Sequence, residues 1–274
     1  LSEKEKKEAY VVGGFVRDLI MQKKLNDIDI MVVGDGINYA KKIAEALGIK
    51  KIVPFEKFGT ALIPGNEIQI EVASARREEY LSNSRKPNKV TYTDLNGDLV
   101  RRDFTINAMA MHLSSKNFGD IIDPYNGKND IEKKILRTPL DPDETFSEDP
   151  LRMMRAAYFS SKLRFPIENE CIESIKRQSE RISIVSWERI RDEFIKILQT
   201  DRPSIGLTIL QDAGIMKIVF PEIHKMYGID QTAEWHHKDI FTHTLQVVDN
   251  AARLSNKMEI RFAALVHDIA KPNT

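Results

Sequence analysis

Residues 10–18, YVVGGFVRD, and residues 26–30, NDIDI, decide how the first part of this chain folds. The first stretch predicts a strand that passes through two glycines into a helix, and the second predicts a β-branched-rich strand. Asp27 and Asp29 are two positions apart on that second strand, so both carboxylates project from one face. Such a pair can hold Mg²⁺ ions, which suits phosphoryl or nucleotidyl transfer.

The glycine pair Gly13 and Gly14 predicts a phosphate-binding turn. Glycines between a strand and a helix let backbone N–H groups approach a phosphate without a Cβ in the way, and Arg17 adds a guanidinium. Taken singly, a tight turn explains the glycines and a solvated strand face explains the two aspartates. Together and in this order they favour a nucleotide site. Glu71 is a third candidate acid, with an exposed hairpin carboxylate as the equal alternative.

The charge balance excludes one class of protein. The 274 residues contain 41 Lys+Arg and 41 Asp+Glu, so this is no generic basic nucleic-acid coat protein. Any positive charge that meets nucleic acid must therefore be concentrated locally. Residues 151–200 carry a modest excess, ten Lys+Arg against seven Asp+Glu.

The compartment follows from what the sequence lacks. Cys171 is the only cysteine, which excludes an intrachain disulfide and a cysteine-based zinc site. The N-terminus has no apolar run of the signal-peptide kind, and no stretch approaches roughly 18 consecutive apolar residues. We expect a cytoplasmic protein without a membrane segment. Because the chain begins at Leu1 and stops soon after VHDIAKPNT, we also expect a fragment.

Hydrophobic periodicity predicts an α+β head, an acidic linker over residues 141–149 and then helices only. Residues 77–99 are polar with weak periodicity and predict a mobile loop. The expected strands are Tyr10–Val12, Asp27–Val33, Thr60–Ile63, Glu67–Ala73 and Ile121–Asp123, the third and fourth forming a hairpin. The expected helices are Phe15–Lys24, Asn38–Leu47, Leu151–Leu163, Glu168–Arg177, Trp187–Leu198, Ser204–Ala213 and Phe241–Leu254.

Residues 101–108, RRDFTINA, place an arginine pair beside an acid. We expect the pair at the entrance of a helix, with Asp103 near its N-terminus, where the arginines can bind triphosphate and ribose. Helix capping by Asp103 and solvated surface arginines explain the same residues about as well.

Residues 148–155, EDPLRMMR, combine a helix start with a candidate base-reading face. Asp149, Arg152 and Arg155 are spaced i, i+3, i+6 along one side of the predicted helix. A carboxylate accepts and a guanidinium donates, so the matching base edge offers an amine beside a ring nitrogen, as cytosine and adenine do. Uracil and guanine present the opposite polarity. The alternative is a capped helix with an intrahelical salt bridge.

These segments together resemble a known family. GGFVRD, NDIDI, RRDFTINAMA, SEDPLRMMRAAYF and ISIVSWERIRDEF occur in the order and approximate spacing of class II tRNA nucleotidyltransferases and bacterial poly(A) polymerases. The chain looks most like a bacterial CCA-adding enzyme. The resemblance implies a polymerase-beta-like nucleotidyltransferase head over residues 1–138, a base-selecting neck over 139–200 and a tRNA-binding helical body over 201–235. It also implies the start of a truncated HD domain over 236–274.

The resemblance also implies roles for particular residues. Asp27 and Asp29 would be the catalytic Mg²⁺ ligands, and the segment 77–99 would match the loop associated with addition of the final A. Glu148, Asp149 and Arg152 match an amino-acid template that selects CTP and then ATP; Tyr158 stands where family members often carry a further arginine. The implied nucleotide-binding set is Gly13, Gly14, Arg17, Arg102, Asp103, Asn107, Glu148, Asp149, Arg152 and Arg155.

The C-terminal segment resembles an HD domain, which binds metal through a His…His-Asp…Asp set. His243, His267 and Asp268 are the candidate ligands of a second divalent metal, whereas the last acid would lie beyond Thr274. Ala270 replaces the glycine common in that motif. Helix-packing histidines are the favoured alternative to a working metal site.

The expected function is CCA addition to the tRNA 3′ end from CTP and ATP, by two-metal nucleotidyl transfer that releases pyrophosphate. The expected partners are tRNA, CTP and ATP, and the oligomeric state, monomer or dimer, stays open. One alternative is a poly(A) polymerase with the same chemistry. Others are an HD phosphohydrolase with a regulatory nucleotide-binding head and an inert RNA-binding module.

Overall fold

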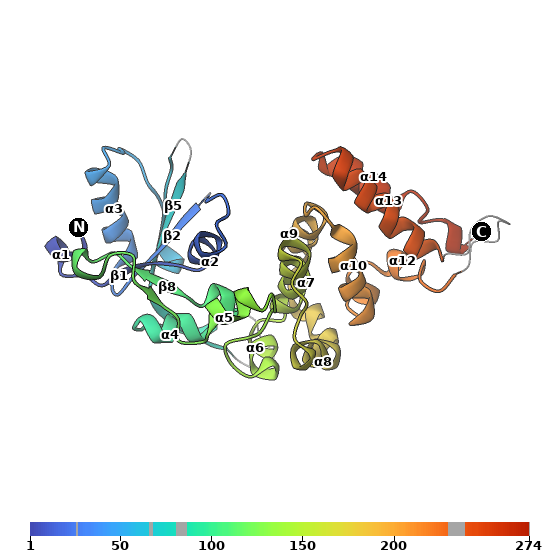
Figure 1. Ribbon diagram of the computed structural model, residues 1–274, viewed down its shortest axis with the longest axis horizontal. Coiled ribbons are helices and arrows are strands. Elements are labelled where there is room, and N and C mark those ends of the chain that lie inside the picture. The colour runs from blue at the N-terminus through green and yellow to red at the C-terminus, as the bar shows by residue number, and fades with distance from the viewer. Residues whose placement is uncertain (26, 66–67, 81–86, 230–238, 274) are drawn as a thin grey trace. The chain divides into compact units, whose positions relative to one another are not determined.

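The computed structural model describes residues 1–25, 27–65, 68–80, 87–229 and 239–273 (Figure 1). The described residues divide into two compact units, the first ending at Leu140 and the second beginning at Asp141. The first unit mixes a sheet with helices, and the second is helical throughout its described part. The predicted α+β class is thereby confirmed. The finer division into head, neck, body and HD start stays a prediction.

The first unit is built on a seven-stranded sheet with the order β3-β4-β5-β2-β1-β8-β9. Only β2 and β5 pair in parallel; the other neighbours are antiparallel. The strands are β1 (Ala9–Val12), β2 (Asp27–Val32), β3 (Val53–Phe55), β4 (Thr60–Ile63), β5 (Gln69–Ser74), β8 (Ala110–His112) and β9 (Ile121–Ile122). The helices are α1 (Ser2–Glu5), α2 (Gly14–Ile20), α3 (Gly36–Ala46), α4 (Leu95–Val100) and α5 (Gly127–Glu132), with single 3₁₀ turns at Glu56–Phe58, Thr105–Asn107 and Ser115–Asn117.

Alternation along the strands gives the sheet two apolar faces. Ile30 and Val32 of β2 pack in one buried cluster with Tyr39 and Ala40 of α3. Met31, between them, packs in another cluster that includes residues of α4. Because side chains alternate along β2, its odd-numbered residues lie on the face that α4 covers.

The loop predicted over residues 77–99 is wrong for the described part of that segment, which forms strands and a helix. Strands β6 (Arg76–Tyr80) and β7 (Pro87–Tyr92) pair antiparallel as a two-stranded ribbon, and α4 follows. The ribbon is held by backbone hydrogen bonds between its own strands, so it forms without the apolar alternation on which the sequence prediction relied. Residues 81–86 of this segment lie outside the described residues.

Two helix predictions also need correction. The first helix ends at Ile20 and not near Lys24, because Gln22 adopts a left-handed conformation with φ of 53°. The acidic linker contains helix α6 (Pro142–Glu148), which the polar composition concealed. Asp141 caps it by accepting from the backbone N–H of Asp143, and proline occupies the first helical position.

The second unit consists of helices connected by short turns. Its five predicted helices are confirmed to within a residue at each end. They are α7 (Leu151–Leu163), α8 (Asn169–Gln178), α9 (Trp187–Leu198), α10 (Pro203–Asp212) and α13 (Ile240–Leu254). The others are α6, α11 (Met216–Val219), α12 (Pro221–His224) and α14 (Met258–Val266), with 3₁₀ turns at Ser179–Ile184 and Lys271–Asn273. Within the described residues, no helix has the length and apolar character that a membrane crossing requires.

An arginine inside the second unit connects three of its helices. Arg261 of α14 is only 2% exposed. Its Nη1 donates to the carbonyl oxygens of Leu198 at 2.7 Å and Thr200 at 2.8 Å, at the end of α9, and its Nη2 donates to that of Ala252 in α13 at 3.1 Å. The carbonyls at a helix C-terminus have no partner within the helix, so a buried guanidinium satisfies several of them at once.

Candidate functional site

The glycine turn lies against an arginine and one of the two aspartates. Gly13 has φ of 71° and ψ of −131°, and its N–H donates to the Met109 carbonyl at 3.1 Å. A Cβ at this position would lie 2.7 Å from Nη1 of Arg102 and 3.8 Å from Oδ2 of Asp29. Glycine is required by both the backbone conformation and this close approach. The turn, Arg102 and Asp29 therefore share one small region at the start of α2.

Three candidate acids lie on the same face of the sheet. Asp27 and Asp29 alternate with Ile28 and Ile30, so their side chains lie on the same face of β2 as Met31. The parallel register places Gln69 beside Asp27 and Glu71 beside Asp29. This confirms the predicted alternation, since Ile70 lies on the opposite, α3 face. The acids do not close around one point: among the described residues, only a cluster in the second unit brings three ligand atoms within 4.8 Å of one another.

Burial and mutual repulsion act on these carboxyls. Burial raises the pKa of Asp29 above its ordinary value; the Asp27 charge raises it further, and the charges of Arg102 and Arg17 oppose the rise. Burial also raises the pKa of Glu71, and the charge of Asp29 adds to the effect. Burial is thus the main cause of both shifts, and a bound cation would favour the ionised form of these carboxyls. A divalent cation with a preference for oxygen ligands fits this donor set.

The arginine pair follows a helix and does not open one. Arg101 and Arg102 come directly after α4 and turn back onto buried Asp98, with Nη2 to carboxylate distances of 2.8 Å for each. Burial alone would raise the pKa of Asp98, but the charges of Arg102 and Arg101 and their hydrogen bonds hold it below its ordinary value. Basic residues are favoured at a helix C-terminus. Asp98, which sequence analysis did not single out, is the anchor that positions Arg102.

Arg17 is buried in a network of polar side chains. It is 3% exposed; its Nε and Nη2 donate to the carboxylate of Asp18 at 2.7 and 2.8 Å, and its Nη1 donates to Oδ1 of Asn107 at 2.7 Å. Asn107 in turn donates to Oδ1 of Asp103 at 3.0 Å. The structure thus joins three of the predicted nucleotide-binding residues to each other. Direct contact of Arg17 with a nucleotide would require its ion pair with Asp18 to open.

The predicted base-reading residues are held in place by ion pairs within the second unit. Arg152 donates from Nη1 to Oε2 of Glu148 at 2.9 Å and to the carbonyl of Thr145 at 3.0 Å. Asp149 accepts from Nη2 of Arg189 at 2.6 Å. Sequence analysis missed Arg189. The available signal was a cation in the first turn of a predicted helix, where the helix dipole disfavours it unless an acid lies opposite.

Helix α7 carries two cation–π pairs. The guanidinium carbon of Arg155 lies 5.3 Å from the ring centroid of Phe159. One helical turn along, Nζ of Lys162 lies 5.6 Å from the ring centroid of Tyr158, the residue that replaces the family's further arginine. Positive charge is therefore present on this side of α7 despite that replacement.

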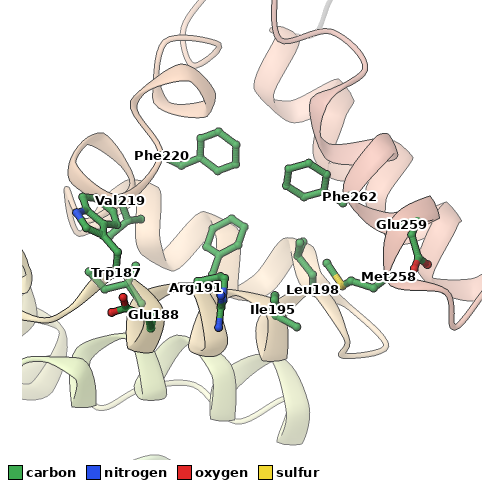
Figure 2. Close-up of a pocket in the computed structure, with 12 residues that line it drawn as sticks. Trp187, Glu188, Arg191, Ile195, Leu198, Val219, Phe220, Met258, Glu259 and Phe262 are labelled. Carbon is green, nitrogen blue, oxygen red and sulfur yellow. The ribbon is translucent and has the colours of Figure 1, made fainter.

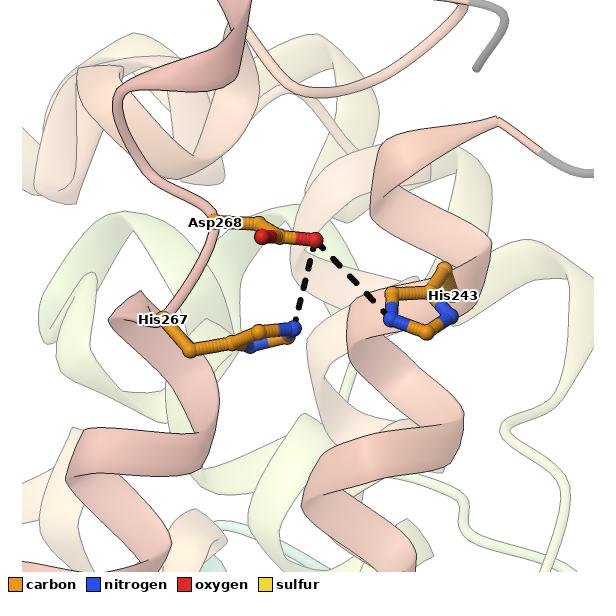
Figure 3. Close-up of side chains that lie close together, drawn as sticks. All are labelled: His243, His267 and Asp268. Atoms are coloured by element: carbon orange, nitrogen blue, oxygen red, sulfur yellow. Dashed lines mark ion pairs between the residues drawn. The ribbon is translucent and has the colours of Figure 1, made fainter. Parts of the chain in front are cut away.

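The three predicted HD ligands come together (Figure 3). Oδ2 of Asp268 lies 3.2 Å from Nε2 of His267 and 3.8 Å from Nε2 of His243, and the two rings are 5.5 Å apart between centroids. The same oxygen accepts from Nζ of Lys271 at 2.7 Å. The donor set fits a transition-metal ion, with a lysine as a competing cation.

The second unit contains an apolar cavity (Figure 2). It has a volume of about 710 Å³ and lies between α9, α11 and α14. The rings of Phe220 and Phe262 face each other across it at 6.5 Å, and Trp187 at its edge is 62% exposed. Apart from Glu188, Arg191 and Glu259, its lining is apolar or aromatic.

The comparisons with known proteins cover all of these regions. Residues 9–137, which hold the glycine turn, both aspartates and Arg102, match the family described as Poly A polymerase head domain. This similarity to the poly A polymerase head domain covers just under half of the chain. Later in the sequence, residues 164–227 match the family described as Probable RNA and SrmB-binding site of polymerase A, and residues 240–274 match the HD domain. Enzymes of this kind generally use a divalent metal.

Similar proteins carry CCA in their names. The Multifunctional CCA protein of Vibrio cholerae serotype O1 (strain ATCC 39541 / Classical Ogawa 395 / O395) is 34% identical over 281 residues, covering 96% of this chain and 64% of that protein. That of Pseudoalteromonas atlantica is 36% identical over 273 residues, with the same coverage. The chain thus spans about 64% of the length of the curated relatives it matches.

Solved structures share the fold. A tRNA nucleotidyltransferase complexed with a primer tRNA and an incoming ATP analog has a TM-score of 0.77 at 27% identity, covering 97% of this chain and 74% of that one. The structure of a CCA-adding enzyme in apo form II has a TM-score of 0.79 at 28% identity, covering 98% and 61%. The polymerase head and the helical unit together therefore match known tRNA-processing folds.

Proposed function

We propose that this chain adds CCA to the 3′ end of tRNA, using CTP and ATP and releasing pyrophosphate. The observation that carries the proposal is the pair Asp27 and Asp29 on β2, beside the Gly13 turn and the guanidinium of Arg102. The names of the relatives support the choice of substrate. Since tRNA is the proposed substrate, we place the enzyme in the cytoplasm.

The proposed reaction is a nucleotidyl transfer. The oxygen of the RNA 3′-hydroxyl bonds to the α-phosphorus of CTP or ATP while the bond to the β-phosphate breaks, and the hydroxyl proton goes to solvent. We assign Asp27 and Asp29 as ligands of Mg²⁺, which when bound supplies a Lewis acid for the phosphoryl oxygens. Arg102, positioned by Asp98, is the proposed partner of the triphosphate.

Base choice is proposed to reside in the second unit. Asp149 would accept from the exocyclic amine of cytosine or adenine, and Arg152 would donate to the neighbouring ring nitrogen. The ion pairs of these residues with Arg189 and Glu148 support the assignment, because a side chain that reads a base must be held in one orientation. Uracil and guanine, with the opposite edge polarity, would be rejected.

One assay tests the proposal. The chain is incubated with tRNA that lacks its 3′ CCA, with Mg²⁺ and with each nucleoside triphosphate singly and in combination, and products are resolved at single-nucleotide length. The expected result is addition of C from CTP and a defined CCA end from CTP with ATP. Incorporation of UTP or GTP at a comparable rate, or no incorporation, would contradict it.

The second candidate is a poly(A) polymerase, favoured by the description of the matching head family. It uses the same acids and the same chemistry. An open-ended A tail on generic RNA, with no requirement for CTP, would decide for it.

A further inference from the structure

The second unit has a polar cavity that no part of the proposed reaction uses. It has a volume of about 820 Å³ and lies between the end of α7, the connection from α9 to α10, and α13. Its lining consists of three arginines, two aspartates, three side-chain amides and one alanine. We call it the arginine groove, after Arg164, Arg202 and Arg253.

The three guanidinium groups are available to a ligand. Arg164 and Arg253 are exposed, and among the described residues neither has a carboxylate partner; Arg253 donates only to Oδ1 of Asn250. Arg164 ends α7 in the left-handed conformation, with φ of 59°, where glycine or asparagine is usual. A residue that is poor for helix termination at this position points to a role for its side chain.

Arg202 is only weakly engaged by the acid nearest to it. Its Nε is 3.7 Å from Oδ2 of Asp249, and its side chain is 58% exposed. Asp249 is already committed to Ser204, since it accepts from the backbone N–H at 3.0 Å and from the hydroxyl at 2.7 Å. An exposed ion pair of this length contributes little, so the guanidinium can turn to a phosphate at small cost.

The groove continues into a smaller cavity. This second cavity has a volume of about 220 Å³ and shares Asp201 with the arginine groove. It adds Lys162 of α7 and Lys196 of α9. Cationic side chains from three helices and a loop thus follow one continuous surface, as a polyanion with repeated charges requires.

We propose that the arginine groove binds the sugar–phosphate backbone of double-stranded RNA. Guanidinium groups match phosphates, and Gln246 and Asn250, one turn apart on α13, can bond ribose hydroxyls. No aromatic residue among the described residues lines the arginine groove itself, so base stacking is not offered there; Tyr158 lines only the smaller cavity, where Lys162 lies against its ring. Sites for small molecules are mostly apolar, as the cavity in Figure 2 is. The lining of the arginine groove, in contrast, is almost entirely polar or charged.

This inference rests on the proposed function for its ligand, the stem of tRNA, and goes beyond it in placing that stem. Arg164 and Arg202 lie in the segment that matches an RNA-binding family, whereas Arg253 lies in the segment that matches the HD domain. The groove therefore assigns the first helices of the HD segment a part in holding RNA.

Binding is measured without nucleotides, so the result does not depend on catalysis. The double variant Arg202→Gln/Arg253→Gln is compared with Arg191→Gln/Lys217→Gln, which removes the same charge from exposed positions outside the groove. The probes are a fluorescent RNA hairpin without a tail and an unstructured single strand. Anisotropy titrations across a salt series give the dissociation constants. Thermal unfolding monitored by circular dichroism verifies that both variants fold.

For the hairpin, we expect the groove variant to weaken binding by at least roughly tenfold. The slope of log K against log salt should fall by about 2, one for each lost phosphate contact. Equal losses in the groove and control variants, or a loss confined to the single strand, would overturn the proposal. If the chain binds the hairpin through the groove but incorporates no nucleotide, the proposed function is refuted and the proposal that the groove binds RNA is upheld.

Discussion

Arg189 and Asp149 form an ion pair, with 2.6 Å between Nη2 and Oδ2, that connects the first turn of α9 to the start of α7. Asp149 also accepts from the backbone N–H of Leu151 at 3.2 Å. The carboxylate is thereby held from both sides. Since this is the group proposed to accept from the base amine, its orientation depends on a residue about 40 positions away in the chain.

Replacing Arg189 should relax base choice. We expect Arg189→Met to lower the preference for CTP and ATP over UTP and GTP by roughly tenfold, because the freed carboxylate samples other orientations. Single-turnover incorporation of each nucleotide measures the preference. Arg191→Met is the matched control, since among the described residues the acid that Arg191 pairs with is its neighbour Asp192. An unchanged preference in Arg189→Met would remove this residue from base selection.

Replacing Asp27 should abolish incorporation. We expect Asp27→Asn to reduce the rate on the order of a thousandfold or more, because the proposed metal loses a charged ligand. RNA affinity should stay within a factor of about two, since the RNA contacts proposed above lie in the second unit. Asp120→Asn, at an exposed position of the same unit, is the control. Substantial residual incorporation would refute the metal assignment.

Replacing Asp29 should stabilise the metal-free protein and at the same time abolish its activity. Burial raises the pKa of Asp29, so folding favours the protonated carboxyl, and at neutral pH the ionised group costs stability. We expect Asp29→Asn to raise Tm by on the order of 2 °C at pH 7. This gain should fall as the pH drops and vanish below about pH 4, where the carboxyl becomes protonated in the unfolded chain too. Calorimetry in the presence of a chelator measures it, and a lower Tm at pH 7 would contradict the prediction.

Replacing Arg261 should unfold the second unit more easily. Arg261→Met leaves the carbonyls of Leu198, Thr200 and Ala252 without their donor, and we expect a loss of about 3 kcal/mol. Both tryptophans of the chain lie after residue 141, so their fluorescence in a denaturant titration reports this unit. Lys257→Met, at an exposed neighbouring position, should change little. Equal stability of the two variants would show that Arg261 is dispensable.

The HD cluster is proposed to hold a divalent cation in competition with Lys271. Because Nζ of Lys271 shares Oδ2 of Asp268 with both histidines, we expect Lys271→Met to raise the affinity for Mn²⁺ by about tenfold. Calorimetric titration of the full chain measures the affinity. His267→Ala should abolish it. If neither substitution alters binding, the histidines serve helix packing, the alternative that the sequence favours.

Local order made part of the site predictable. The turn, strand β2 and the carboxylate pair lie within about twenty residues, and their geometry follows from glycine conformation and from strand alternation. The ribbon β6–β7 was missed because its pairing is a backbone property that leaves no apolar pattern. Helix α6 was missed because capping by Asp141 outweighs its acidic composition.

The sequence by itself determined the division into an α+β part and a helical part, the face of β2 on which Asp27 and Asp29 lie, and the resemblance to a nucleotidyltransferase family. These follow from periodicity and from short motifs, which act within a few residues of each other. Only the tertiary structure decided that Asp98 positions Arg102, that Asp18 and Asn107 occupy Arg17, and that Arg189 holds Asp149. Asn107 and Arg189 reach their partners through packing between segments that are distant in the sequence. Asp18 and Asp98 are close in sequence to Arg17 and Arg102, but whether such neighbours pair depends on the burial and the backbone turns that the fold imposes.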